Sequence, residues 1–462
     1  MPKLCSPVSR LWVRFETDGR RGALSRLFLR EDEPFMGVVV HDVPLPDEVL
    51  TELGVQRYVQ IDHESWAASQ SSFPEGGVDF LQDAYLLSYI SLLRLPKDLI
   101  EAFFSVFRTL RASPAAQRWV WYCQFVFAQQ SGETVTRVCS HWPELTSLLG
   151  EHAPMFTAVV ALSALPRMVA LYREKGLPDS ILRDTLSDFL IVMEDYRDKH
   201  AGRWGLSLID WLYYHFTGKL FKLGRLQFKP GTFGQDIRVF RQNGADEVRV
   251  LSGDGVAYDQ RGLRIPADKE DSGLGVWRAT LTLEPGVACG HPLTTDAVCQ
   301  RQMVRLSLDE WDEVLARGAK ILEVHIPKGD RLTSKSCWES YNWAVQFYAD
   351  LCPETRFMAL TCESWILDPQ LRRMLSPSAN IVRFQNDYHQ YPVPFISDGD
   401  DIFDYVFDGR PADLATAPRD TRLRRAVLDH LAAGGWMQFS GGFMLLDPDT
   451  GRLIPRRRGS TC

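Results

Sequence analysis

The sequence lacks the features that mark several large classes of protein. Its nine cysteines are scattered and form no C-x-x-C pair, so neither a disulfide framework nor a zinc ribbon is predicted, and reduced thiols are expected. The 52 basic and 59 acidic residues give a net charge of -7, which disfavours a surface for nucleic acid. The opening segment MPKLCSPVSRLWVRFETDG has no apolar core of the kind found in secretory signals, and we find no apolar run near the roughly 18 residues that a membrane span needs. We therefore expect a soluble, cytoplasmic protein that binds neither nucleic acid nor a membrane.

The periodicity of the apolar residues divides the chain into two halves. Its 462 residues, 45% of them hydrophobic and 24% charged, have an ordinary globular composition and are enough for two domains. From about residue 79 to residue 223, apolar residues recur every three or four positions, which predicts helices. Gly176 and Pro178 separate two of these helices, and Asp179 is placed to cap the second. We predict a mainly helical domain over residues 1–222 and a second domain over residues 223–462.

The second half has the pattern of strands. Short alternating runs such as DIRVFRQ and EVRVLSG, separated by Asn-Gly, Asp-Gly and Pro-Gly turns, predict antiparallel strands. Further along, predicted strands at residues 321–326, 357–364 and 380–385 alternate with helices that begin near Ser334 and Pro369. Such alternation implies crossover units with adjacent parallel strands. The predicted fold is therefore α/β, a mixed sheet preceded by an α-helical region.

The strand predicted at residues 321–326 carries two polar side chains on one face. Because side chains alternate between the faces of a strand, Ile321, Glu323 and His325 lie on the same side. A strand covered by helices on both sides is typically apolar throughout. The pair of Glu323 and His325 therefore indicates that this face meets a cleft, although a structural histidine fits the same pattern.

The turn after this strand has the composition of an anion site. Gly329 ends the strand region, and Thr333 or Ser334 can cap the helix that follows. A strand, a glycine-containing turn and a helix N-terminus direct unpaired N–H groups toward one point, which suits a phosphate. Lys328 and Arg331 add positive charge there. Turns of this kind are also common in α/β proteins where they bind nothing.

Several longer segments allow a comparison with a known family. EVHIPKGDRLTSKSCWESYNWAVQFY, FMALTCESWILDPQLRRML and GGFMLL resemble the GNAT-like C-terminal domain of a bacterial acyltransferase family. VALYREKGLPDSILRDTLSDFLIVMEDY, followed by WLYYHFTGKLFKLGRLQF, resembles the helical N-terminal region of the same family. The resemblance implies a GNAT-like mixed sheet with a splayed parallel strand pair, and acetyl-CoA or another acyl-CoA as co-substrate.

The resemblance also assigns roles to the strand and the turn described above. The pantetheine arm of the donor would lie along residues 321–326, beside the splayed strand 357–364, and the pyrophosphate would bind at the turn. The implied cofactor-binding residues are Ile326, Lys328, Gly329, Arg331, Thr333 and Ser334. The acceptor is unidentified, and an amine on a small molecule or a peptide is the default for this fold.

Acyl transfer to an amine needs a base that removes a proton from the acceptor nitrogen. Glu323 and His325 are candidates for this base, acting directly or through water. Glu363, on the neighbouring predicted strand, is a third candidate. Cys362 lies on an apolar-patterned strand, and we interpret it as a buried thiol rather than a nucleophile.

Two departures from the family pattern leave alternatives open. The turn lacks the Gln/Arg-x-x-Gly-x-Gly/Ala consensus, since only Gly329 is present. The segment WILDPQLRRML lacks the tyrosine that protonates the leaving thiolate in many GNAT enzymes, and Tyr388 and Tyr391, which lie further on, are poor substitutes. One alternative is a non-catalytic binding or regulatory protein with a degenerate acyltransferase fold. Another is a hydrolase that uses Glu323 and Glu363 as a carboxylate pair.

Overall fold

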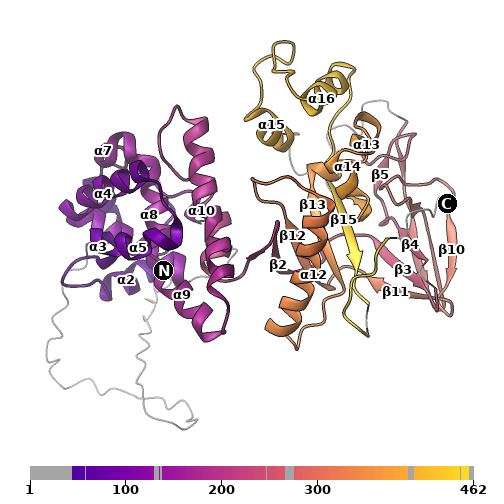
Figure 1. The fold of residues 1–462 in the computed structure, drawn as a ribbon, viewed down its shortest axis with the longest axis horizontal. Coiled ribbons are helices and arrows are strands. Elements are labelled where there is room, and N and C mark those ends of the chain that lie inside the picture. Colours follow the sequence, from indigo (N-terminus) through magenta and orange to yellow (C-terminus); the bar gives the residue numbers. More distant parts are fainter. Residues whose placement is uncertain are drawn as a thin grey trace, which may run out of the picture. The chain divides into compact units, whose positions relative to one another are not determined.

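The computed structural model describes residues 44–456, except for residues 58, 130–134, 136–137, 246, 266–274, 394–399 and 448. Residues 1–43 of the predicted helical domain therefore lie outside the described residues. The described part of the first half is helical, as its periodicity predicts (Figure 1). Its elements are α1 (Pro46–Glu52), α2 (His63–Ser71), η1 (Asp79–Leu81), α3 (Asp83–Leu93), α4 (Lys97–Ala112), α5 (Pro114–Gln129), α7 (Thr146–Leu149), η2 (Gly150–Met155), α8 (Phe156–Leu162), α9 (Leu165–Glu174), α10 (Asp179–Lys199) and α11 (Ile209–Phe216).

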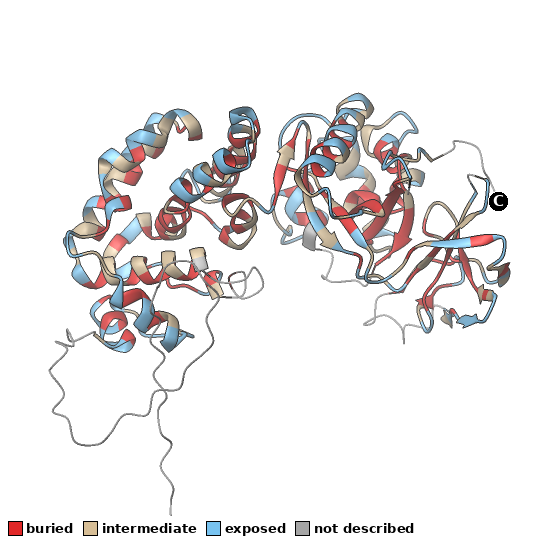
Figure 2. Cartoon of the chain, turned by 90° about the horizontal axis from the view of Figure 1, so that it is seen from below, coloured by how far each residue is buried: buried red, intermediate tan, exposed pale blue. Residues whose placement is uncertain are grey.

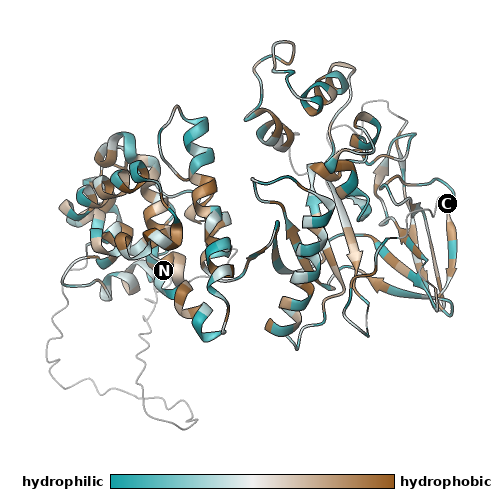
Figure 3. Ribbon diagram, in the orientation of Figure 1, coloured by the Kyte–Doolittle hydropathy of each residue, from teal (hydrophilic) through white to brown (hydrophobic). Residues whose placement is uncertain are grey.

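These helices form because each presents one apolar face to a shared core. In α4, Leu99, Phe103, Val106 and Leu110 follow one another at intervals of three or four residues, and all four are buried. Figure 2 shows the buried residues of the helices in red, and Figure 3 shows their hydrophobic residues in brown. Replacing a buried phenylalanine such as Phe103 with alanine should cost about 3–5 kcal/mol.

One predicted helix signal is wrong in detail. Asp179 is the first residue of α10 rather than its cap, because Pro178 occupies the N-cap position and no side chain caps the helix there. Proline fixes the extended backbone that precedes a helix, so the boundary is set by chain geometry. The carboxylate of Asp179 still lies in the first turn, where the helix dipole favours negative charge.

One segment passes the length and composition test for a membrane helix. Thr146–Glu174 is apolar enough to cross a bilayer, but 56% of its most apolar window is buried inside the structure. The segment is divided among α7, η2, α8 and α9, and every residue of Phe156–Leu162 except Thr157 is buried. Core helices of soluble proteins pass the same test, so this segment is weak evidence for a membrane span.

The second half contains the predicted strands and their connecting helices. The strands are β1 (Phe221–Leu223), β2 (Leu226–Thr232), β3 (Arg238–Gln242), β4 (Val248–Leu251), β5 (Ala257–Tyr258), β6 (Trp277–Arg278), β7 (Leu281–Glu284), β8 (Val287–Gly290), β9 (Pro292–Leu293), β10 (Val304–Ser307), β11 (Trp311–Leu315), β12 (Lys320–His325), β13 (Ala359–Ser364), β14 (His389–Pro392) and β15 (Ser440–Leu445). The helices are α12 (Ser334–Leu351), η4 (Trp365–Leu367), α13 (Leu371–Met374), α14 (Asn380–Gln385), α15 (Asp400–Phe407) and α16 (Arg422–Ala432).

The main sheet is mixed, with the strand order β1-β2-β12-β13-β15-β14. β12 and β13 are parallel and adjacent, as predicted, and α12 connects them. The other neighbouring pairs of this sheet are antiparallel. The predicted boundary between residues 222 and 223 falls inside β1, the first strand of the sheet.

The segment Asn380–Gln385 was predicted to be a strand and is instead α14. Ile381, Val382 and Phe384 favour a strand by local propensity. The tertiary environment overrides this preference, because Gln385 is buried and its amide donates to the carbonyls of Ile366 and Asp368 at 2.6 and 2.9 Å. The strand that follows along the chain, β14, occupies the sheet edge beside β15.

The predicted alternation of side chains along β12 is confirmed. Leu322 and Val324 belong to the large apolar core that also contains residues of α12 and of the helical half. Ile321 belongs to a different core, together with Ala359 of β13 and Tyr391 of β14. Glu323 and His325 therefore lie on the face of Ile321, beyond the end of that second core, where they are only half-buried.

Candidate active site

The parallel pair β12–β13 separates toward the C-terminal ends of its strands. The two strands pair only from Ile321 opposite Ala359 to Glu323 opposite Thr361. β12 nevertheless continues to His325, paired with β2 along its whole length, and β13 continues to Ser364, paired with β15 along its whole length. The structure thus contains the predicted splayed pair, and each strand is held from its outer side.

The turn after β12 is open. Gly329 has a φ of 137°, in the region that favours glycine, and no described heavy atom lies within 4 Å of the position that a Cβ would take. Thr333 is the N-cap of α12, as predicted, and its hydroxyl accepts a hydrogen bond from the Ser336 N–H at 3.1 Å. Ser334 is the first helical residue, and Arg331 is exposed. The backbone at Gly329 is therefore unobstructed on the side where a Cβ would point, close to the N-terminus of α12.

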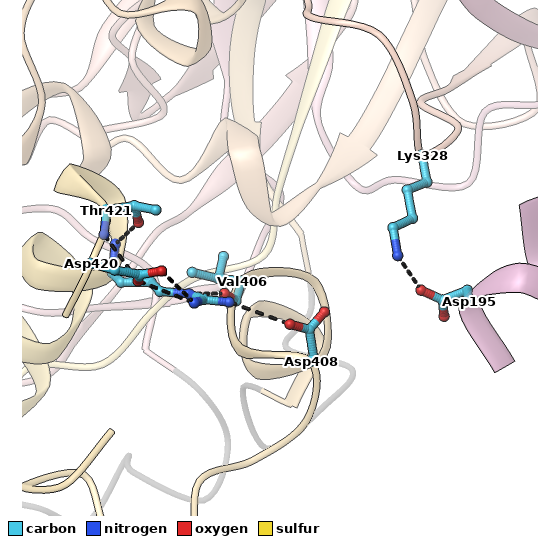
Figure 4. Close-up of polar contacts among 7 residues, drawn as sticks. Asp195, Lys328, Val406, Asp408, Asp420 and Thr421 are labelled. Atoms are coloured by element: carbon cyan, nitrogen blue, oxygen red, sulfur yellow. Dashed lines mark hydrogen bonds and ion pairs between the residues drawn. The ribbon is translucent and has the colours of Figure 1, made fainter. Parts of the chain in front are cut away.

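Lys328 is already engaged with the helical half. Its ammonium group lies 2.5 Å from a carboxylate oxygen of Asp195 on α10 (Figure 4). The other oxygen of Asp195 pairs with Lys199. The hydrogen bond with Asp195 is the main reason that the pKa of Lys328 is raised, against the opposing effect of partial burial. Lys328 is thus a cation held at the edge of the turn rather than a free phosphate ligand.

Glu323 and His325 meet on the sheet, as the alternation predicts. The Nε2 atom of His325 lies 3.2 Å from Oε2 of Glu323. The same carboxylate oxygen is 2.8 Å from Nζ of Lys229, which lies directly opposite Glu323 on β2. Burial alone would raise the pKa of Glu323, but the hydrogen bonds and charges of His325 and Lys229 outweigh it and lower that pKa. Glu323 is therefore an anion at neutral pH.

Glu363, the third predicted catalytic residue, has a different environment. Its Oε1 accepts hydrogen bonds from Gln235 at 2.9 Å and from the Tyr391 hydroxyl at 3.1 Å. Burial raises its pKa, and the negative charge of Glu323 adds to this effect, while the two hydrogen bonds oppose it. The two carboxylates lie on the same face of the sheet and are close enough to influence each other.

Comparison with known families identifies both halves of the chain. Residues 85–218 match the family model of the N-acyltransferase N-terminal domain, and residues 220–444 match that of the GNAT-like C-terminal domain. The chain belongs to the GNAT-like acyltransferases. No curated protein matches it.

Solved structures of other acyltransferases share the fold of this acyltransferase. One, in complex with decanoyl-CoA and teicoplanin, is 21% identical with a TM-score of 0.56 and covers 87% of this chain and 99% of its own. Another, a mutant in complex with octanoyl-CoA, is 21% identical with a TM-score of 0.57 and the same coverage. At this level of identity the likeness shows the fold alone.

Sequence reasoning missed several residues that contact the members of this candidate site. Arg225, in the turn between β1 and β2, donates through Nε to the Asp330 carbonyl at 2.7 Å and so supports the turn. Lys229, Gln235 and Tyr391 are the partners of the two carboxylates. All lie far from residues 323–334 in sequence, and only the strand order brings them together.

Further features of the described residues bear on where the chemistry takes place. Cys362 is buried, as predicted, and burial raises the pKa of its thiol, which makes it a poor nucleophile. Among the described residues, no group of three or more His, Cys, Asp or Glu side chains could hold a metal ion. Open cavities of about 500 and 430 Å³ lie elsewhere, one beside Arg241 and Asp447 and one beside Arg111.

Proposed function

We propose that this acyltransferase uses an acyl-CoA as donor and transfers the acyl group to an amine of a small molecule or a peptide. The observation that carries the proposal is the separation of β12 from β13 beyond Glu323 and Thr361. Backbone groups on the facing edges of the two strands have no strand partner past that point. An extended chain with amide groups, such as pantetheine, can supply the missing hydrogen bonds in the way that an added strand does.

The turn after β12 is the proposed seat of the pyrophosphate. Ile326 leads from the strand into the open corner at Gly329, and the first amides of α12, at Ser334 and beyond, face the same corner. Arg331 and Lys328 supply positive charge, and Thr333 fixes the start of the helix. To bind a phosphate, the ammonium group of Lys328 must either break its ion pair with Asp195 or contact Asp195 and the phosphate at the same time.

For the chemical step, we assign His325 as the base and Glu323 as its anionic partner. The base takes a proton from the attacking amine nitrogen, which adds to the thioester carbonyl and expels the thiolate of CoA. The low pKa of Glu323 makes this carboxylate a weak base but a good partner for an imidazolium. Glu363, with its raised pKa, is the second group on this face that can accept a proton.

The structural neighbours support the choice of donor and acceptor. They hold octanoyl-CoA, decanoyl-CoA or CoA; one of them also holds teicoplanin and another holds 10C-teicoplanin. We therefore favour a medium-chain acyl-CoA over acetyl-CoA as the donor, and an amine-bearing natural product or peptide as the acceptor.

Donor binding is tested by thermal unfolding with free CoA, acetyl-CoA, octanoyl-CoA and decanoyl-CoA. A ligand that binds only the native state, at 100 times its Kd, stabilises the fold by about 2.7 kcal/mol. The expected result is a concentration-dependent rise in Tm that is larger for octanoyl-CoA or decanoyl-CoA than for acetyl-CoA. If no CoA compound raises the Tm at millimolar concentration, the proposed donor is wrong.

Catalysis is tested by following thiol release from the preferred donor with a panel of primary amines. Replacing both Glu323 and His325 with Gln should abolish turnover and leave donor binding intact. Glu313→Gln is a matched control, since Glu313 is also a strand carboxylate in an ion pair, with Arg238 at 2.9 Å, outside the site. Unchanged turnover in the double variant would remove the pair from the mechanism, and product release without any CoA compound would favour the hydrolase.

A further inference from the structure

A buried pair of a histidine and an aspartate in the helical half lies behind the proposed base. Nε2 of His215, on α11, is 3.1 Å from Oδ2 of Asp188, on α10, and their side chains are 1% and 5% exposed. Burying a carboxylate and an imidazole away from water is costly, and well-packed apolar residues would stabilise the core at least as well. The pair therefore calls for a role beyond packing.

The hydrogen bonds of His215 show how the pair is held. Its Nδ1 lies 3.3 Å from the Trp211 carbonyl oxygen, and its Nε2 lies 3.1 Å from Oδ2 of Asp188. The amide nitrogen of Gln227, on β2, lies 3.1 Å from Nε2 of His215. Gln227 is directly opposite His325 in the β2–β12 register.

Trp211 connects this pair to His325. Its indole N–H donates to the same Oδ2 atom of Asp188 at 3.3 Å, so one carboxylate oxygen binds both the indole and His215. The indole ring packs edge-to-face against the His325 imidazole, with 4.7 Å between ring centroids and 62° between planes. The carboxylate fixes the indole, and the indole fixes one side of the imidazole.

We infer that Asp188, His215 and Trp211 form a positioning unit that sets the orientation of His325 for acyl transfer. The unit makes the helical half a functional part of the active site. The inference rests on the proposed role of His325 as base. The groups that face His325 are Glu323 on its own strand, Lys229 across on β2 through the shared carboxylate, Glu363 on β13, and Trp211 with the pair behind it.

The closing experiment compares two conservative variants with two matched controls. Trp211→Phe keeps an aromatic ring and removes the N–H, and Asp188→Asn keeps the shape and removes the charge. Trp204→Phe and Asp98→Asn are the controls, because the Trp204 indole donates to Asp98 at 3.1 Å in the same helical half, away from His325. Near-ultraviolet circular dichroism confirms that each variant is folded.

The first readout is the NMR spectrum of protein labelled with 13C at the histidine Cε1, in which His325→Gln identifies the signal of His325. We expect this signal to move in Trp211→Phe and in Asp188→Asn, because the indole is removed or released, and to stay in place in both controls. The second readout is thiol release from octanoyl-CoA with a primary amine. We expect kcat to fall about tenfold in both test variants, with the KM for octanoyl-CoA unchanged.

The outcomes separate the inference from the proposed function. If His325→Gln keeps full turnover, the assignment of His325 as base fails, whatever the NMR spectra show. If His325→Gln loses turnover but both test variants match the controls in the His325 signal and in kcat, the positioning unit is refuted. Should Asp188→Asn fail to fold, Trp211→Phe decides the second question alone, since it leaves the Asp188–His215 pair in place.

Discussion

Replacing Gly441 with alanine should disrupt the link between Tyr391 and Glu363. Tyr391, Gly441 and Glu363 lie side by side on β14, β15 and β13. The tyrosine ring crosses over Gly441 to donate its hydroxyl hydrogen bond to Glu363 at 3.1 Å. A Cβ at position 441 would lie 2.1 Å from one ring carbon of Tyr391 and 2.7 Å from its hydroxyl oxygen. The bridge exists only because residue 441 has no side chain.

The expected cost follows from these distances. Non-bonded carbon atoms pack at about 3.5–4.0 Å, so the ring must move by more than about 1 Å. Tyr391 is fully buried between Phe233 and Phe443, which leaves it little room to move. Overpacking of this kind costs about 1–3 kcal/mol, and losing a hydrogen bond to a carboxylate about 1.5–3 kcal/mol. We expect Gly441→Ala to destabilise the fold by about 3 to 6 kcal/mol.

Urea unfolding followed by tryptophan fluorescence measures this loss. Gly234→Ala is the control, because no described heavy atom lies within 4 Å of its Cβ position and its φ is not positive, and we expect a change below about 0.5 kcal/mol. In a protein that already carries Tyr391→Leu, Gly441→Ala should destabilise the fold much less, since the tyrosine ring is gone. The reasoning is refuted if Gly441→Ala is as harmless as Gly234→Ala, or if its cost is the same in both backgrounds.

Three further predictions concern charge. Burial raises the pKa of Asp368 to about 7, so the folded protein favours the protonated carboxyl group. The contribution of this group to stability is present at low pH and is lost as the pH rises through about 7. Asp368→Asn should therefore flatten the fall in Tm between about pH 4.5 and 8. Asp195→Asn frees Lys328 and should tighten CoA binding severalfold in calorimetry, whereas Lys328→Met should weaken CoA binding. If both variants bind CoA with the affinity of the unchanged protein, Lys328 is excluded as a phosphate ligand. Arg225→Met removes the support of the Asp330 carbonyl and should weaken CoA binding with little change in Tm.

The sequence was informative where local rules decide the outcome. The helices of the first half follow from residues spaced by three and four, and the cap at Thr333 follows from its place before a helix-forming run. The meeting of Glu323 with His325 follows from strand alternation, which has a fixed period of two. Each of these features involves residues close together in the chain.

The features that sequence reasoning missed depend on long-range packing. Asn380–Gln385 has the propensity of a strand, but the buried amide of Gln385 finds its partners on η4 and holds the segment as a helix. Asp195 reaches Lys328 across 133 residues of sequence. Tyr391 has no special local signal, and its role depends on a glycine in the strand between it and its partner. A single sequence contains no record of such contacts.

The full-length pairing of β12 with β2 and of β13 with β15 has a consequence for binding kinetics. Because each strand is paired on its outer side over its whole length, the separation of β12 from β13 beyond Glu323 does not depend on a bound ligand. A donor that adds between strands already held apart does not have to order the protein around it, so little of its interaction energy is spent on rearrangement. We expect association rates to increase linearly with donor concentration in stopped-flow measurements, without the plateau that a slow opening step would impose.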